Sequence, residues 1–238
     1  MNRSQQFDPT FRTNATAAGV LFLVTHVGSI GGAALYGPVL HNEGITGGME
    51  NILLLGGALL ETVTALAVVG TAVALYPAVR RHREGLSLGY VSLRTLEAAN
   101  IAVSVIALML VAAAQSMAGT SDSFSTWRTM LTEFHGAAFL VGPGLVCATN
   151  TVVIAYVLYK SRLVPRFIPM LGLIGGPLII VMNVLLLFGE LPAWSGLAVV
   201  PIFAWELSLA LCLIIRGFNP KTVVAPVAAD SVELALAV

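Results

Sequence analysis

Residues 52–79 read ILLLGGALLETVTALAVVGTAVALYPAV, a run in which Glu61 is the only charged side chain. An α-helix needs about 20 predominantly apolar residues to cross the hydrocarbon core of a membrane, and this run is longer than that. Membrane β-strands show a different pattern, with apolar and polar residues alternating over segments of about ten residues. The run therefore predicts a transmembrane α-helix.

The composition of the whole chain agrees with this prediction. Of the 238 residues, 57% are hydrophobic and 10% are charged, and the mean hydropathy is +0.90. Soluble globular domains carry about 25% charged residues, so this chain has too little polar surface to be covered by water. We expect the lipid bilayer as its partner. No basic run suggests nucleic acid, and Cys147 and Cys212 lie inside apolar runs, where they are expected to be small buried residues rather than a disulfide framework.

Five further stretches have the same character, and they set the predicted fold class. We predict an all-α, polytopic transmembrane bundle of six helices, formed by one domain over residues 14–218. The predicted spans are residues 14–36, 52–79, 86–117, 131–159, 167–188 and 194–215. Residues 1–13 are predicted to be an N-terminal segment, and residues 219–238 a disordered tail.

The basic residues predict the orientation of the bundle. Ten of the twelve lie before the first span, in the second and fourth connections, or after the last span; they are Arg3, Arg12, Arg80, Arg81, Arg83, Lys160, Arg162, Arg166, Arg216 and Lys221. Arg128 is the exception in the third connection. The positive-inside rule places the basic side in the cytoplasm, so both termini are predicted to be cytoplasmic and the membrane to be the inner one.

Glycine and proline predict where helices approach closely or bend. Gly28 with Gly32, and Gly172 with Gly176, have the small-xxx-small spacing that lets two membrane helices come together. Proline removes a backbone donor inside a helix. We therefore expect kinks near residues 142–144 and 175–177.

Four ionisable side chains are predicted to share one depth in the membrane. Each charged residue in the bilayer core costs about 3 kcal/mol on insertion scales, so each needs a reason. At a rise of about 1.5 Å per residue, the four lie near the midplane. They are Glu61, Glu97, Glu206 and His26. This convergence predicts a polar site inside the bundle.

The third predicted helix adds a stripe of polar residues to this site. The stripe consists of Arg94, Glu97, Asn100 and Ser104, which share one helix face. Arg94 is expected to pair with Glu97 on its own helix, or to reach Glu61 or Glu206 on another. One arginine neutralises one acid, with His26 as a second cation. The remaining acids must then be protonated or meet a cation from outside, since an unpaired buried charge is costly.

Glu133, His135 and Asn183 are candidates for a second, outer site. Glu133 and His135 are two residues apart, so they point to different faces of a helix. Asn183 is at comparable depth in the fifth span. No pair of histidines has metal-ligand spacing and no glycine-rich phosphate loop follows a strand, so we expect neither a metal nor another cofactor.

The chain resembles a family of bacterial multi-pass membrane proteins, the domain of unknown function numbered 4386. The segments that carry the resemblance are GALLE (57–61), GTAVALYP (70–77), GYV (89–91) with Arg94 and Leu96-Glu97, LVPR (163–166), LGLIGGPL (171–178) and FAWE (203–206) with RGF (216–218). The resemblance implies a bundle of six or seven membrane helices. It also places Glu61, Arg94, Glu97, His135 and Glu206 on the family's pattern, although this chain has GAA at 136–138 where the family has an aromatic residue.

Three functions are compatible with these residues. The first is binding or transport of a small hydrophobic or amphipathic molecule, which could be a cation. The residues expected to bind it are Glu61, Arg94, Glu97, Asn100, Glu206 and His26. The second is a membrane-embedded enzyme that uses Glu61 or Glu206 as general acid in an isomerisation, cyclisation or epoxide opening on an isoprenoid or other lipid. The third is a structural or accessory subunit in which the acids hydrogen-bond between helices.

Overall fold

The computed structural model describes residues 9–41, 48–117, 122–190, 192 and 195–223, and the regular elements among these residues are all helical. The elements are α1 (Pro9–Leu40), α2 (Met49–Val79), α3 (Glu84–Met117), α4 (Asp122–Phe139), the π-helical segment η1 (Leu140–Val146), α5 (Cys147–Ser161), α6 (Phe167–Leu187), α7 (Ser195–Ile215) and α8 (Pro220–Val223). The predicted all-α class is confirmed.

Six helices in the described part of the chain are long and apolar enough to cross a membrane. Five of them are α1, α2, α3, α6 and α7, and the sixth is the continuous helix formed by α4, η1 and α5. The prediction of six spans is therefore confirmed. α1 begins at Pro9, before the predicted start of its span. The short helix α8 opens the predicted tail, whose residues 224–238 lie outside the described residues.

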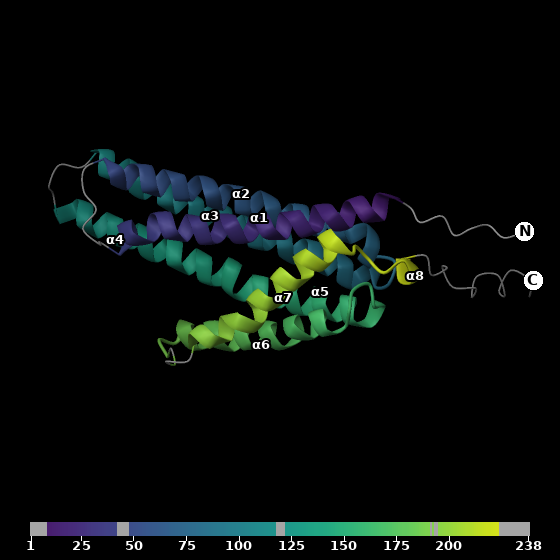
Figure 1. Cartoon of the computed structure of the whole chain (residues 1–238). Coiled ribbons are helices and arrows are strands. Elements are labelled where there is room, and N and C mark those ends of the chain that lie inside the picture. Colours follow the sequence, from purple (N-terminus) through teal and green to yellow (C-terminus); the bar gives the residue numbers. More distant parts are fainter. Residues whose placement is uncertain (1–8, 42–47, 118–121, 191, 193–194, 224–238) are drawn as a thin grey trace, which may run out of the picture.

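The helices form two groups that diverge toward one end of the bundle (Figure 1). α1, α2 and α3 pack side by side, and α5 and α6 lie across the bundle from α1 and α2. α7 packs on α6 and then crosses to α1, where Gly19 of α1 faces Ala210 and Ile214 of α7. The start of α1 and the helix α8 lie at the same end of the bundle, as an even number of spans requires.

Small residues allow this packing. A Cβ atom at Gly28 would clash with Oγ1 of Thr64 and lie 3.0 Å from the carbonyl oxygen of Leu60, so α1 approaches α2 too closely there for a larger residue. A Cβ atom at Gly176 would lie 3.0 Å from the carbonyl oxygen of Ala148 on α5. These close approaches occur at glycines of the two predicted small-xxx-small pairs. Such contacts matter because van der Waals packing is a main source of association energy between membrane helices.

Pro143 lies inside η1, where the helix widens by one residue per turn. The backbone N–H of Cys147 donates to the carbonyl of Gly142, an i to i−5 bond that replaces the normal α-helical pattern. A π-helical turn next to a proline is a common way to accommodate the missing donor. The irregularity expected at residues 142–144 is therefore present, whereas α6 continues through Pro177 as an α-helix.

One large apolar core closes the end of the bundle that holds the start of α1 and the helix α8. Its largest buried side chains are Phe22, Tyr90, Trp205 and Phe218, contributed by α1, α3, α7 and the segment after α7. A second core joins α1, α2 and α3 toward the opposite end. No core of this kind joins α1 to α6 or to the beginning of α7 in the described part of the chain, and the cavity described below lies there.

Arg128, the exception to the basic asymmetry, has a structural role. Its guanidinium donates a hydrogen bond to the carbonyl oxygen of Val39, near the C-terminal end of α1. The last carbonyls of a helix have no partner within the helix, and a cation there is favourable. This contact gives a reason for one arginine on the side that the positive-inside rule leaves without positive charge.

Arg12 makes the equivalent contact at the other end of the bundle. Its Nη2 atom donates to the carbonyl oxygens of Ile214, at 2.8 Å, and Ile215, at 3.1 Å, at the end of α7. Because hydrogen bonds from a charged donor are worth about 2 kcal/mol and this one is partly exposed, Arg12→Gln should lower the free energy of unfolding by about 1 kcal/mol. The measurement is equilibrium unfolding in mixed micelles by sodium dodecyl sulfate, followed by circular dichroism. Arg83→Gln, exposed at the same end, is the control and should leave stability unchanged.

Candidate functional site

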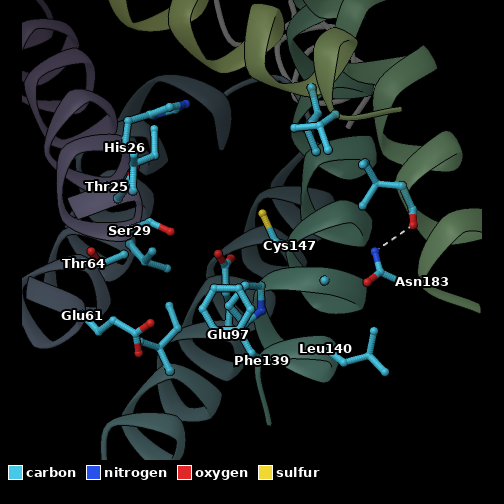
Figure 2. Close-up of a pocket in the computed structure, with 18 of the residues that line it drawn as sticks. Thr25, His26, Ser29, Glu61, Thr64, Glu97, Phe139, Leu140, Cys147 and Asn183 are labelled. Atoms are coloured by element: carbon cyan, nitrogen blue, oxygen red, sulfur yellow. Dashed lines mark hydrogen bonds between the residues drawn. The ribbon is translucent and has the colours of Figure 1, made fainter. Parts of the chain in front are cut away.

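A cavity of about 580 Å³ lies between the two helix groups. Figure 2 shows side chains of α1 and α2 on one side of it, Asn183 of α6 on the other, and Glu97 and Cys147 between them. Its polar lining residues are Thr25, His26, Ser29, Tyr36, Glu61, Thr64, Arg94, Glu97, His135, Cys147, Asn183 and Glu206. Most of the remaining lining residues are apolar. The cavity thus combines polar and apolar side chains on its walls, as a site for a small amphipathic molecule would.

Arg94 and Glu97 form a buried ion pair on α3. Nη1 of Arg94 lies 3.1 Å from Oε2 and 3.3 Å from Oε1 of Glu97, and both residues are less than 5% exposed. Nε of Arg94 donates to the hydroxyl of Tyr90 at 3.1 Å, and the side chain of Asn150 on α5 donates to Glu97. The guanidinium also lies over the ring of Phe22 on α1. A buried pair with this many partners is electrically neutral and hydrogen-bonded, so it links three helices.

His26 and Glu206 form a second pair at the level where α1 and α7 meet. Nε2 of His26 lies 3.3 Å from Oε2 of Glu206. The other ring nitrogen, Nδ1, lies 2.8 Å from the carbonyl oxygen of Phe22; a carbonyl only accepts, so Nδ1 donates. A hydrogen bond between Nε2 and Oε2 then needs one proton, carried either by the ring nitrogen or by the carboxyl group. The ring packs edge-on against Phe203.

Glu61 is the centre of a third cluster. Its Oε1 atom accepts a hydrogen bond from the hydroxyl of Tyr36 at 2.7 Å, and the side chain of Ser104 lies beside the carboxyl group. The Ser104 hydroxyl is 2.6 Å from Nδ1 of His135, whose ring packs against Tyr36. Glu61 is 1% exposed, and its Oε2 atom has no hydrogen-bond partner among the described residues. This oxygen is the unsatisfied group of the cavity.

Some lining residues of the cavity are also exposed on the outside of the bundle. The large apolar ones are Ile30 of α1, Leu186 of α6, and Val199 and Phe203 of α7, at 60%, 45%, 51% and 42% exposure. Apolar residues at this depth in a membrane protein face lipid tails rather than water. The wall of the cavity is therefore in part a surface that faces lipid.

The structure brings most of the predicted site residues to this one cavity. Those that line it are His26, Glu61, Arg94, Glu97, His135, Asn183 and Glu206. His135 and Asn183, predicted as part of an outer site, thus share the cavity with the midplane acids. Two predicted residues are elsewhere: Glu133 is exposed on α4, and Asn100 is half-buried, with its amide donating to the carbonyl of Leu96 on its own helix.

Sequence reasoning missed Tyr36 and Asn150. Tyr36 lies at the predicted end of the first span, where a tyrosine is typical of the membrane interface, so its position in the sequence gives no sign of a contact with Glu61. Asn150 is a polar residue within an apolar run, and this was a usable signal. Among the described residues, no three His, Cys, Asp or Glu side chains lie close enough together to hold a metal ion.

The family model for Domain of unknown function (DUF4386) matches residues 17–217. The chain belongs to this family. The matched region extends from within α1 to the second residue after the end of α7, so it includes every residue that lines the cavity. No curated protein and no solved structure matches the chain. The resemblance expected from the sequence is confirmed, and the family description carries no activity with it.

Proposed function

We propose that this DUF4386 protein binds a small amphipathic molecule inside the bilayer, with a positively charged or hydrogen-bond-donating head at Glu61. The observation that carries the proposal is the free Oε2 atom of Glu61. Among the described residues that line the cavity, it is the one buried side-chain nitrogen or oxygen atom without a hydrogen-bond partner. Oδ1 of Asn150, whose amide nitrogen donates to Glu97, also lacks a partner, but Asn150 is not a lining residue. A buried acceptor without a partner costs about 1–3 kcal/mol, and a donor supplied by a ligand would recover this energy.

The charges around the cavity favour a cation over an anion. Arg94 is balanced by Glu97 at 3.1 Å, and His26 with Glu206 holds one shared proton. These four side chains therefore sum to zero charge. Glu61 has Tyr36 and Ser104 beside it but no cation, so its ionised form would leave one negative charge unbalanced. An ammonium group would balance that charge, whereas a carboxylate would be repelled.

The shape of the cavity favours an apolar tail on the same molecule. The apolar lining residues Val68, Ile101 and Leu140 surround the inner part, and Ile30 and Val199 reach the lipid side. A volume of about 580 Å³ is within the range for small-molecule sites. Entry between α1 and α7 would let the tail remain in an apolar environment throughout binding.

Binding of three probes with the same tail and different heads tests the proposal. In phosphatidylcholine nanodiscs, radiolabelled dodecylamine should bind saturably after subtraction of empty nanodiscs. Unlabelled dodecanol should compete more weakly, and dodecanoate should not compete. Glu61→Gln keeps the shape of the side chain but removes its charge, so it should weaken dodecylamine binding at least about tenfold. Glu133→Gln, an exposed acid outside the cavity, is the matched control and should bind as the wild type does.

Two results would contradict the proposal. Equal competition by dodecanoate would mean that the head group is not recognised, and an unchanged affinity in Glu61→Gln would mean that Glu61 is not the anchor. Mass spectrometry of small molecules that co-purify with the wild type and are lost in Glu61→Gln would identify the natural ligand class. If folded protein shows neither saturable binding nor a specific co-purified molecule, the acids act as hydrogen-bonding groups between helices.

The same carboxyl group supports a second candidate function, general-acid catalysis on a lipid. Tyr36, Glu61, Ser104 and His135 form a chain of polar groups along which a proton could reach Glu61. A general acid must be able to receive its proton again after each turnover. Comparison of lipid extracts from cells with the wild type and with Glu61→Gln tests this function, since a product present only with the wild type would support it.

A further inference from the structure

A second cavity, of about 540 Å³, lies at the end of the bundle that holds the start of α1 and α8. It is formed by the connection between α5 and α6 and by the residues that follow α7. Three arginines line it, Arg162, Arg166 and Arg216, and no acidic residue is among the lining residues. This basic pocket is separate from the cavity that contains Glu61.

None of the three arginines forms an ion pair with another described residue. Like charges that converge without a counterion repel one another. The guanidinium of Arg166 lies over the ring of Tyr159, 5.0 Å from its centroid, and this cation–π contact orients the Arg166 side chain. The pocket thus concentrates positive charge and leaves its hydrogen-bond donors available.

The backbone of the pocket is fixed by contacts between its two sides. The N–H of Asn219, after α7, donates to the carbonyl of Leu163 at 2.8 Å, and the Asn219 side chain donates to the carbonyl of Arg162 at 3.4 Å. Arg162 has a φ of 56°, in the left-handed region that non-glycine residues rarely adopt. Such a conformation persists where surrounding contacts determine it, so the pocket is a built feature of the fold.

We propose that this basic pocket binds the phosphate group of an anionic membrane lipid. Guanidinium groups bind phosphate through paired, charge-assisted hydrogen bonds. The pocket is at the basic end of the bundle, which the positive-inside rule places in the cytoplasmic headgroup layer, where anionic lipids are found. Ile215 and Phe167, next in the chain to Arg216 and Arg166, are exposed apolar residues and would contact the acyl chains. This apolar surface favours a lipid over a free phosphate ion.

Native mass spectrometry tests the proposal on the full chain in nanodiscs of equal parts phosphatidylcholine and phosphatidylglycerol. The wild type should retain phosphatidylglycerol in preference to phosphatidylcholine. The double variant Arg166→Gln/Arg216→Gln should bind phosphatidylglycerol about tenfold more weakly. The matched control, Arg80→Gln/Arg83→Gln, removes the same charge from exposed residues outside the pocket and should retain the preference.

Each other outcome overturns the proposal. An equal loss in the control variant would mean that the preference comes from overall surface charge. If inorganic phosphate raises the melting temperature of the wild type while no lipid preference is found, the pocket binds a soluble anion. Arg166→Lys/Arg216→Lys keeps the charge and guards against a folding defect in the glutamine variant. Its affinity for phosphatidylglycerol should fall less than that of the glutamine variant. Wild-type affinity in both the lysine and the glutamine variants would exclude a lipid site at this pocket.

Discussion

Glu97→Ala should lower the free energy of unfolding by about 3–5 kcal/mol, because it leaves the buried guanidinium of Arg94 without its counterion. Arg94 is 3% exposed and its remaining partner, the hydroxyl of Tyr90, carries no charge in the ordinary state. The side chain of Asn150 would lose its acceptor at the same time. The measurement is equilibrium unfolding by sodium dodecyl sulfate in mixed micelles, followed by circular dichroism.

A double-mutant cycle separates the pair from the rest of the site. Arg94→Met/Glu97→Leu removes both charges, so its loss of stability should be clearly smaller than the sum of the losses in the two single variants. Glu133→Ala, an exposed acid on α4, should change stability by no more than about 0.5 kcal/mol. Additive losses in the cycle, or a loss below about 1 kcal/mol in Glu97→Ala, would show that the ion pair does not hold the helices together.

The stability of this ion pair and the proposed binding at Glu61 are separable. Glu97 has three polar contacts from Arg94 and Asn150, whereas Glu61 has one free oxygen in the same cavity. A residue whose hydrogen bonds are complete in the folded chain gains little from a ligand, while an unsatisfied acceptor gains a full hydrogen bond. The three carboxyl groups that line the cavity are therefore expected to differ in what their removal does.

Position along a helix can be estimated from the sequence, because the rise of a helix is constant. This is why Glu61, Glu97, Glu206 and His26 were expected at one level, and they line one cavity. Arg94 and Glu97 are three residues apart on one helix, so their pairing was also among the expected arrangements. Both inferences use geometry along a single helix, which the sequence determines.

Rotation about the helix axis could not be predicted in the same way. In water, the apolar face of a helix marks the side that packs inward, but in lipid both faces are apolar. The pairing of Glu61 with Tyr36, and of Glu206 with His26, depends on how three different helices are turned. For the same reason Asn100 was grouped with the site although its side chain bonds back to α3. These contacts required the structure.

Gly175→Val should lower the free energy of unfolding by about 3 kcal/mol, because overpacking a close helix contact forces the backbone to move. A Cβ atom at Gly175 on α6 would lie 2.7 Å from the backbone nitrogen and 3.0 Å from the Cα of Ile202 on α7. Backbone atoms cannot rotate away as a side chain could. α6 and α7 must therefore separate, which also displaces Phe203 in the wall of the cavity.

Gly89→Val is the matched control, since a Cβ atom at Gly89 on α3 would meet nothing within 4 Å. The same exchange there removes a flexible residue from a helix without a clash, so stability should be unchanged or slightly higher. Unfolding in mixed micelles compares the two variants, and binding of dodecylamine to Gly175→Val reports on the cavity wall. Equal stability of the two variants would mean that α6 and α7 do not rely on this contact. A loss in Gly175→Val alone, together with weaker dodecylamine binding, would show that the approach of these two helices sets both the stability of the bundle and the shape of the site.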